Sequence, residues 1–186
     1  MTTRCTTPWI LALALAGCGQ VADPADTTPP TRSPSMARAA ATLVSTDGEV
    51  LGHVTVTPRT RGVQLHGKVS GLTPSARHGL HIHEHGTCGD GSDGFQQAGG
   101  HYAPDGHDHG DPGSLTHHAG DLGNLEAMAD GVAMIDIDAH GLELDALLDR
   151  TIVVHAGADD GETQPGGDAG PRLACGTFHD EMAGSQ

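Results

Sequence analysis

Two stretches in the first half of the chain alternate apolar and polar residues with a period of two. They cover residues 52–57 and 62–69, and the residues between them, 58–62, have the composition of a hairpin loop. Alternation with this period places one face of a strand in the core and the other in solvent. Both stretches therefore predict half-buried strands, and further strands are expected at residues 40–45, 79–84, 124–129, 132–138 and 151–155.

Composition agrees with an all-β fold. Glycine is frequent, at 28 of 186 residues, and aromatic residues make up only 2% of the chain. Many turns and a core of valine, leucine, isoleucine and alanine are therefore expected. No stretch keeps a long helical period, although residues 145–149 could form one helical turn. Short strands with glycine-rich turns favour an antiparallel sandwich or barrel.

The N-terminal segment has the composition of an export signal. An early arginine, Arg4, precedes an apolar run from Trp9 to Ala16, far shorter than the roughly 20 residues that span a bilayer. The residues Leu-Ala-Gly-Cys that end at Cys18 resemble the lipobox of bacterial lipoproteins. We therefore expect residues 1–17 to be removed and Cys18 to be lipidated. Conventional cleavage after Ala16 is the alternative.

The remaining residues divide into three parts. Residues 18–38 are rich in proline, threonine and serine, and such a segment buries too little apolar surface to fold. It is expected to be a disordered tether in front of a folded domain at residues 39–179, with a polar tail at 180–186. This organisation predicts an exported protein of the cell envelope or periplasm, anchored to a membrane.

The formal charge of −15, from 24 acidic and 9 basic residues, limits the partners. Nucleic acids and anionic lipid surfaces attract proteins with an excess of positive charge. No nucleic-acid partner is expected, and membrane attachment is expected through the lipid anchor only.

Cysteine usage also indicates export. Cys5 would leave with the signal and Cys18 would carry the lipid, so Cys88 and Cys175 remain. In an exported domain these two are most simply interpreted as one disulfide.

The segment from Gly86 to Asp121 has few apolar residues and includes HYAPDGHDHG, with three histidines. A long segment of this kind inside a compact domain is uncommon unless it is functional or disordered. A disulfide at one end and a metal at the other could hold it in place of a core. Residues 90–94 lack the remaining oxygen ligands of a calcium loop and are interpreted as a turn.

Two histidines of one predicted strand, His81 and His83, share a face because side chains alternate along a strand. Two neutral imidazoles there would make half of a metal site, although surface histidines in strands are ordinary. His155 follows an apolar strand, where a buried polar ring needs a partner. It is either a satisfied core histidine or a third nitrogen ligand.

Six segments then follow one another along the chain: GLHIHEHG, AGGHYAP, HGDP, HAGDLGN, TIVVHAGADD and GPRLACG. Together and in this order they closely resemble the copper,zinc superoxide dismutases, over most of the chain from about residue 39 to residue 178. The resemblance implies an eight-stranded antiparallel Greek-key barrel or sandwich with a long metal-binding loop that a disulfide pins. It also implies copper and zinc as cofactors, and the bridge between Cys88 and Cys175 lies where the family has its own.

The resemblance further implies two ligand sets that share His101. The expected copper ligands are His81, His83, His101 and His155. The expected zinc ligands are His101, His109, His118 and Asp121. Nitrogen-rich sites suit Cu(II), and a closed site of three histidines and one aspartate suits Zn(II). His107 and His117 are rival ligands, but they break the family spacing.

Two more residues match family positions. Asp159 matches an aspartate that links a copper-bound imidazole to a zinc-bound one, although a solvated turn would also place an aspartate there. Arg172 matches the arginine that sits beside copper and holds an anionic substrate, with a surface salt bridge as its alternative. The resemblance assigns catalytic roles to Arg172 and to His101, the latter as a proton donor.

The implied reaction is the conversion of superoxide to oxygen and hydrogen peroxide by alternate reduction and oxidation of copper, which would protect the cell envelope. A metal carrier with the same ligands, and a structural relative braced by zinc, are alternatives. Arg172 beside a complete copper set favours the enzyme. The segment GETQPGGDAG is shorter than in many relatives and has no lysine, and the residues after Cys175 are polar, so a monomer is preferred to a homodimer.

Overall fold

The computed structural model describes Met1 and residues 38–181. The predicted signal, Cys18, nearly all of the tether and the end of the tail lie outside the described residues. The elements, in chain order, are β1 (Ala39–Ser45), β2 (Val50–Arg59), β3 (Gly62–Val69), β4 (Arg77–His83), η1 (Gln96–Ala98), β5 (Asp121–Glu126), β6 (Ala133–His140), α1 (Leu144–Leu147), β7 (Thr151–His155), β8 (Arg172–Thr177) and β9 (His179–Asp180).

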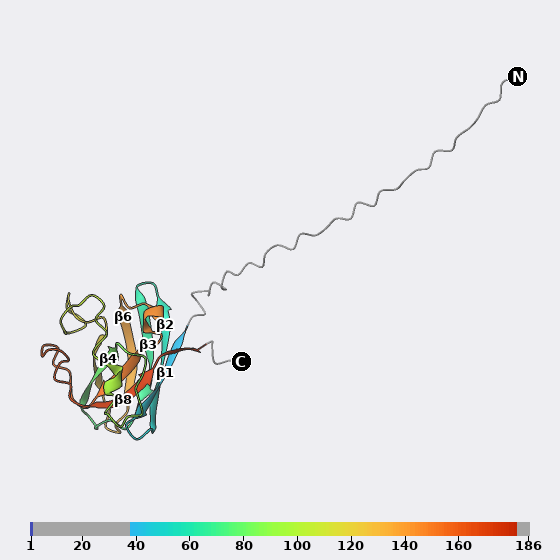
Figure 1. Ribbon diagram of the computed structural model, residues 1–186. Helices are drawn as coiled ribbons and strands as arrows, with labels where there is room; N and C mark the ends of the chain where they lie inside the picture. Colours follow the sequence, from blue (N-terminus) through green and yellow to red (C-terminus); the bar gives the residue numbers. More distant parts are fainter. Residues whose placement is uncertain (2–37, 182–186) are drawn as a thin grey trace. The chain divides into compact units, whose positions relative to one another are not determined.

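The strands form one antiparallel sheet that curls into a nearly closed barrel (Figure 1). Its order is β5-β4-β7-β8-β1-β2-β3-β6, and the short β9 pairs with β1. Three neighbouring pairs, β3/β6, β4/β7 and β8/β1, are not consecutive in the sequence. These crossings confirm the predicted Greek-key barrel.

The barrel interior is built from the inward residues of the alternating strands. In β2 and β3 buried Val54, Val56 and Leu65 alternate with exposed or half-buried neighbours. The predicted period-two strands are thus confirmed. Phe178, which follows β8, is the fully buried aromatic residue of this main core, and partly buried Tyr102 packs against the core.

Strands β4 and β7 differ, because nearly every residue in them is buried. Leu80 and Ile82 of β4 belong to the main core, so His81 and His83 point to the outer face. That face is covered by two connections: the metal loop, residues 84–120 between β4 and β5, and the rim loop, residues 156–171 between β7 and β8. The outer faces of β4 and β7 are therefore buried under these two loops, and they form the floor of a site.

A second, smaller core lies under the metal loop. It contains Phe95 and Ala98 of that loop with Val153 and Cys175 on the outer faces of β7 and β8. The Cys88–Cys175 disulfide is present and joins the metal loop to β8, with its Cα atoms 5.8 Å apart. The predicted bridge is confirmed, and it holds the metal loop against the barrel.

Some expectations about the elements needed correction. β5 begins at Asp121, ahead of the predicted start at residue 124, and the helical turn is α1. β8 and β9 were not predicted from periodicity. Within residues 38–181 no helix has the length and apolar character needed to cross a membrane.

Candidate metal centre

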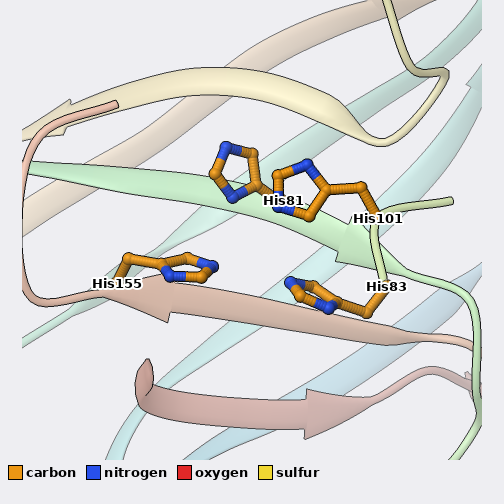
Figure 2. Close-up of side chains that lie close together, drawn as sticks. All are labelled: His81, His83, His101 and His155. Carbon is orange, nitrogen blue, oxygen red and sulfur yellow. The ribbon is translucent and has the colours of Figure 1, made fainter. Parts of the chain in front are cut away.

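The backbone brings four histidines from three segments to one place on the outer face of the barrel (Figure 2). His81 and His83 come from β4 and His155 ends β7, the neighbouring strand. His101 comes from the metal loop, which pairs with β4 through a single bridge between His83 and His101. Beside it, the Tyr102 N–H donates to the Ile82 carbonyl at 2.8 Å. The donor nitrogens of the four rings lie within 4.8 Å of one another.

Hydrogen bonds on one side of each ring determine which nitrogen faces its neighbours. His83 Nδ1 lies 3.0 Å from the Gly99 carbonyl, and His155 Nδ1 lies 3.1 Å from the Gly170 carbonyl. A carbonyl only accepts, so each Nδ1 carries the proton and each Nε2 keeps its lone pair. In His81 the roles of the nitrogens reverse, because Nε2 lies 2.7 Å from Asp159 Oδ2.

The three nitrogens left over by this pattern are buried and have no hydrogen-bond partner. They are His81 Nδ1, His83 Nε2 and His155 Nε2. Buried polar atoms are rarely left unpaired. Three unpartnered lone pairs aimed into one space, with His101 beside them, fit a nitrogen-ligated metal such as copper.

Burial also keeps His81, His83 and His155 neutral, as metal ligands must be. Burial lowers the pKa of His81 to about 4 against the opposing hydrogen bond to Asp159. It lowers the pKa of His155 to about 3 and that of His83 even further. Neutral lone pairs are therefore available throughout the physiological pH range.

A second set of donors converges on Asp121. Its Oδ1 atom lies 2.9 Å from His101 Nδ1, 2.9 Å from His109 Nδ1 and 3.4 Å from His118 Nδ1. Its other oxygen accepts hydrogen bonds from the N–H groups of Gly110 and His118. Three nitrogens and one carboxylate oxygen around a point match the ligand chemistry of a closed zinc site.

His109 shows why a cation belongs there. Its Nε2 lies 2.9 Å from Asp159 Oδ1 and donates to it, so the lone pair of Nδ1 faces Asp121 Oδ1. Two facing lone pairs repel unless a proton or a metal ion lies between them. Burial alone would lower the pKa of His109, but Asp159 and Asp121 outweigh burial and raise it.

His101 and Asp159 connect the two sets. His101 belongs to the group with His81, His83 and His155 and also to the group around Asp121. Asp159 is buried and touches His81 with one oxygen and His109 with the other. Burial opposes the charged form of Asp159, but the His81 hydrogen bond prevails and lowers its pKa to about 2.

One detail of the second group differs from the expected set. The four donors that lie within 4.8 Å of one another are those of His101, His109, Asp121 and His81, with His81 in the place expected for His118. His81 enters because its ring centroid is only 3.9 Å from that of His101. His118 remains at 3.4 Å from His101 Nδ1 and from Asp121 Oδ1.

Arg172 stands at the first residue of β8, and its guanidinium is held by the metal loop. It donates to the Phe95 carbonyl at 2.5 Å and to the Gly99 carbonyl at 2.6 Å. The Gly99 carbonyl also accepts from His83. Arg172 and His83 thus share one acceptor, and a fixed cation lies next to the four-histidine group.

The site opens to solvent through a cleft of about 570 Å³. Its lining includes His83, His101, His155 and Arg172, with the rim loop forming one wall. A larger hollow of about 820 Å³ lies beside the disulfide, but it contains neither donor group. The smaller cleft is therefore the candidate functional one, because it is lined by donor histidines and Arg172.

The rival histidines lie outside both groups. His107 is exposed, and His117 Nδ1 lies 2.6 Å from the His118 carbonyl. His85, which follows the ligand pair two residues after His83, is likewise outside both groups and faces Glu84 and the Gln97 carbonyl. His118 is also in neither group, but it lies 3.4 Å from Asp121 Oδ1, whereas neither rival forms an ion pair with Asp121 within residues 38–181.

Sequence reasoning missed three residues that hold the ligands. Buried His78 has its Nδ1 atom 2.8 Å from the carbonyl of His155. The Asn124 side chain pairs with the main chain of Asp159, and the Gln164 side chain pairs with the main chain of His109. Only His78 gave a sequence signal, because it directly precedes the predicted strand at residues 79–84 that carries the ligand pair.

Comparison with known proteins agrees with this geometry. The family model for copper/zinc superoxide dismutase matches residues 50–178. The chain is 34% identical over 180 residues to the Cu-Zn superoxide dismutase of Deinococcus radiodurans, covering 90% of this chain and 91% of that one. It is 38% identical over 152 residues to an extracellular Cu-Zn superoxide dismutase of Brugia pahangi, covering 75% and 74%.

Among solved structures, the crystal structure of a superoxide dismutase-like protein from Bacillus subtilis has a TM-score of 0.67 and 33% identity, covering 74% of this chain and 96% of that one. The family match spans most of the folded domain, and each relative is more than 30% identical. The chain therefore belongs to the copper/zinc superoxide dismutase family, and its cofactors are copper and zinc.

Proposed function

We propose that this chain dismutates superoxide to oxygen and hydrogen peroxide in the cell envelope. His81, His83, His101 and His155 hold copper, and His101, His109, His118 and Asp121 hold zinc. When bound, copper would supply the one-electron chemistry that both halves of the reaction need. The position of His101, with Nδ1 2.9 Å from Asp121 Oδ1 and its ring among the other three copper donors, is the observation that carries this proposal.

Within this reaction each nearby residue has a separate task. Arg172 holds a small anion at the base of the cleft, because its charge is fixed beside the four histidines by two carbonyls. His101 delivers a proton from Nε2, the nitrogen turned away from Asp121. Asp159 keeps His81 and His109 in the tautomers that leave their Nδ1 lone pairs free.

The decisive test measures superoxide dismutation and metal content on the same purified sample. We expect one copper and one zinc per chain and a rate that disappears when copper is removed and returns with it. A fully loaded protein with no activity would instead support a metal carrier.

We further propose that the chain works outside the cytoplasm. Residues 1–17 act as a signal, residues 18–38 as a tether from a lipid on Cys18, and residues 39–179 as the enzyme domain with a polar tail. A disulfide in the described domain and relatives named extracellular support export. A monomer is proposed, because residues 179–186 are mostly polar and offer little apolar surface for a dimer contact.

Replacement of Cys18 tests the anchor. Cys18→Ser should move the protein from the membrane fraction to the soluble fraction, since stable anchoring depends on the acyl chains. Cys5 lies in the same leader, so Cys5→Ser is the matched control, and this variant should stay in the membrane fraction. Continued membrane fractionation of Cys18→Ser would overturn the lipid anchor and leave the reaction untouched.

A further inference from the structure

One side chain of the rim loop, Gln164, is bonded to both main-chain groups of His109. The His109 N–H donates to Gln164 Oε1 at 2.8 Å, and Gln164 Nε2 donates to the His109 carbonyl at 2.9 Å. Within residues 38–181 these two groups of His109 make no hydrogen bond to any other main-chain group. The carboxamide of Gln164 therefore takes the place of a strand partner for this residue.

The position of His109 in the fold makes such a support necessary. Its ring is buried between Asp121 and Asp159, but it belongs to no strand or helix. The surrounding residues 103–117 are mostly glycine, proline and polar residues, and Leu115 is fully exposed. Packing of apolar side chains cannot hold the backbone of His109, so hydrogen bonds must do so.

The rim loop that carries Gln164 is itself well defined. Asp160 accepts from the N–H groups of Glu162 and Thr163 and from the Thr163 hydroxyl, and Gly167 N–H donates to the Thr163 carbonyl. Two glycines then bring the loop against the metal donors. A Cβ atom on Gly166 would lie 3.3 Å from His101 Nε2, and one on Gly167 would lie 1.9 Å from Asp159 Oδ1.

We propose that Gln164 is a positioning residue of the zinc site and couples that site to the wall of the copper cleft. Through the main chain of His109 it fixes where the Nδ1 lone pair points, and through the rim loop it connects that geometry to Gly166 beside His101. This inference rests on the proposed zinc ligands. It adds that zinc binding and order of the cleft wall depend on each other through one carboxamide.

Asn124 provides an internal comparison. Its carboxamide pairs with Asp159 in the same manner, with Asp159 N–H donating at 2.8 Å and Asn124 Nδ2 donating to the Asp159 carbonyl at 2.9 Å. His109 and Asp159 then contact each other through their side chains. Both partners of this contact therefore have their backbones held by an amide from a neighbouring element.

The first test replaces Gln164 by methionine, which keeps a long side chain and removes both hydrogen bonds. The matched control is Gln97→Met, an exposed glutamine of the metal loop with no side-chain hydrogen bond in the described structure. Loss of an outer partner of a metal ligand typically weakens metal binding about 10- to 100-fold. We expect a chelator to remove zinc from Gln164→Met at least about tenfold more readily than from the wild type. The copper affinity of this variant and the zinc retention of Gln97→Met should both match the wild type.

Two readouts separate positioning from a general loss of structure. Cobalt(II) placed in the zinc site should show an altered visible spectrum in Gln164→Met and the wild-type spectrum in Gln97→Met. Gln164→Glu keeps an acceptor for the His109 N–H, so it provides a second variant if the methionine variant does not fold. Wild-type zinc retention and cobalt spectra in a folded Gln164 variant would overturn the positioning role.

The coupling is tested by amide hydrogen exchange at residues 161–164, 166 and 167 of the rim loop. In the wild type, removal of zinc should speed exchange there about tenfold. In Gln164→Met exchange should be fast with or without zinc, so that the zinc effect disappears. An equal zinc effect in both proteins would refute the coupling. None of these measurements uses dismutase activity, so they stand apart from failure of the proposed reaction.

Discussion

At the scale of single residues, hydrogen bonds to one nitrogen of each imidazole orient the other nitrogen toward the metal position. His83 and His155 each have one nitrogen held by a carbonyl, and His81 has one held by Asp159. Each bond decides the tautomer before any metal arrives, because an acceptor requires a proton on the nitrogen that faces it. The lone pairs that converge are therefore preset, and little reorganisation is needed on binding.

Arg172 should matter for activity and not for metal binding. Arg172→Ala removes the fixed charge at the base of the cleft, and we expect activity to fall by about one to two orders of magnitude, because a correctly placed anion-binding group lowers the barrier to reaction. Copper and zinc content should stay at wild-type levels, because Arg172 belongs to neither donor group. Activity and metal content are measured on the same preparation.

Arg61→Ala is the control for lost charge, since Arg61 is an exposed arginine of the β2–β3 turn outside the cleft. Equal activity in Arg172→Ala and the control would argue against anion docking. Reduced copper content in Arg172→Ala would instead make the arginine a structural residue of the site.

The expected donor residues and Asp159 could be named from the sequence, whereas the supports Gln164 and Asn124 could not. His81 and His83 reveal themselves by a period-two spacing, and the other donors are implied by a resemblance of short segments. Gln164 and Asn124 act on the main chain of residues far away in the sequence. A side chain that bonds a distant backbone leaves no pattern of spacing, because its partner is determined only by the folded loops.

At the scale of elements, the metal loop is the unusual part of the molecule. It buries Phe95 and Ala98 against β7 and β8 near the disulfide, but farther along it relies on polar contacts with Asp121 and Asp159. A loop with so little apolar burial opens locally more easily than the strands. Metal binding at its far end should therefore decide how ordered that half of the loop is.

Loss of the zinc donor Asp121 should expose the metal loop to proteases. Asp121→Ala removes the oxygen on which three nitrogens converge, and it also removes the acceptor for the Gly110 and His118 N–H groups. We expect this variant to lose zinc and to be cleaved within residues 103–118 at least about tenfold faster than the wild type. The cleavage sites are identified by mass spectrometry of the fragments.

Asp105→Ala, an exposed aspartate of the same loop with no side-chain hydrogen bond in the described residues, is the matched control. Its digestion should match the wild type. If Asp121→Ala loses zinc and yet resists protease as well as the control does, zinc does not brace the loop.

Periodicity predicted the strands that have one solvent-facing side, and it missed β8, which is covered on both faces. β2, β3 and β6 alternate, and they lie close to their predicted bounds. β8 was missed because Ala174, Cys175 and Gly176 are buried in succession, with Ala174 in the main core and Cys175 in the second core. A strand between two cores shows no alternation.

At the scale of the whole molecule, the net charge of the protein has the same sign as the charge of its substrate. The chain carries −15 and superoxide is an anion, so the distant field of the protein repels it. Arg172 is the one Lys or Arg among the residues that line the described cleft. The rim loop has Glu162 and Asp168 and no lysine. Attraction is thus confined to the cleft floor, and repulsion dominates at longer range.

Salt dependence of the rate tests this balance. Salt screens distant charges first, because the Debye length falls from about 30 Å at 0.01 M to about 10 Å at 0.1 M. Raising ionic strength over this range should weaken repulsion more than the attraction of Arg172. We therefore expect kcat/KM to stay constant or to rise, by less than about threefold.

Glu162→Lys reverses one charge at the rim and should give the opposite trend, with a higher rate at low salt that falls as salt is added. Asp138→Lys makes the same charge change on β6, outside the cleft lining, and should leave the trend close to that of the wild type. Should the wild-type rate fall steeply with salt, as it does for enzymes that attract their substrate from a distance, the repulsive field would not govern encounter. The cleft would then contain a source of positive potential beyond Arg172 and the metals.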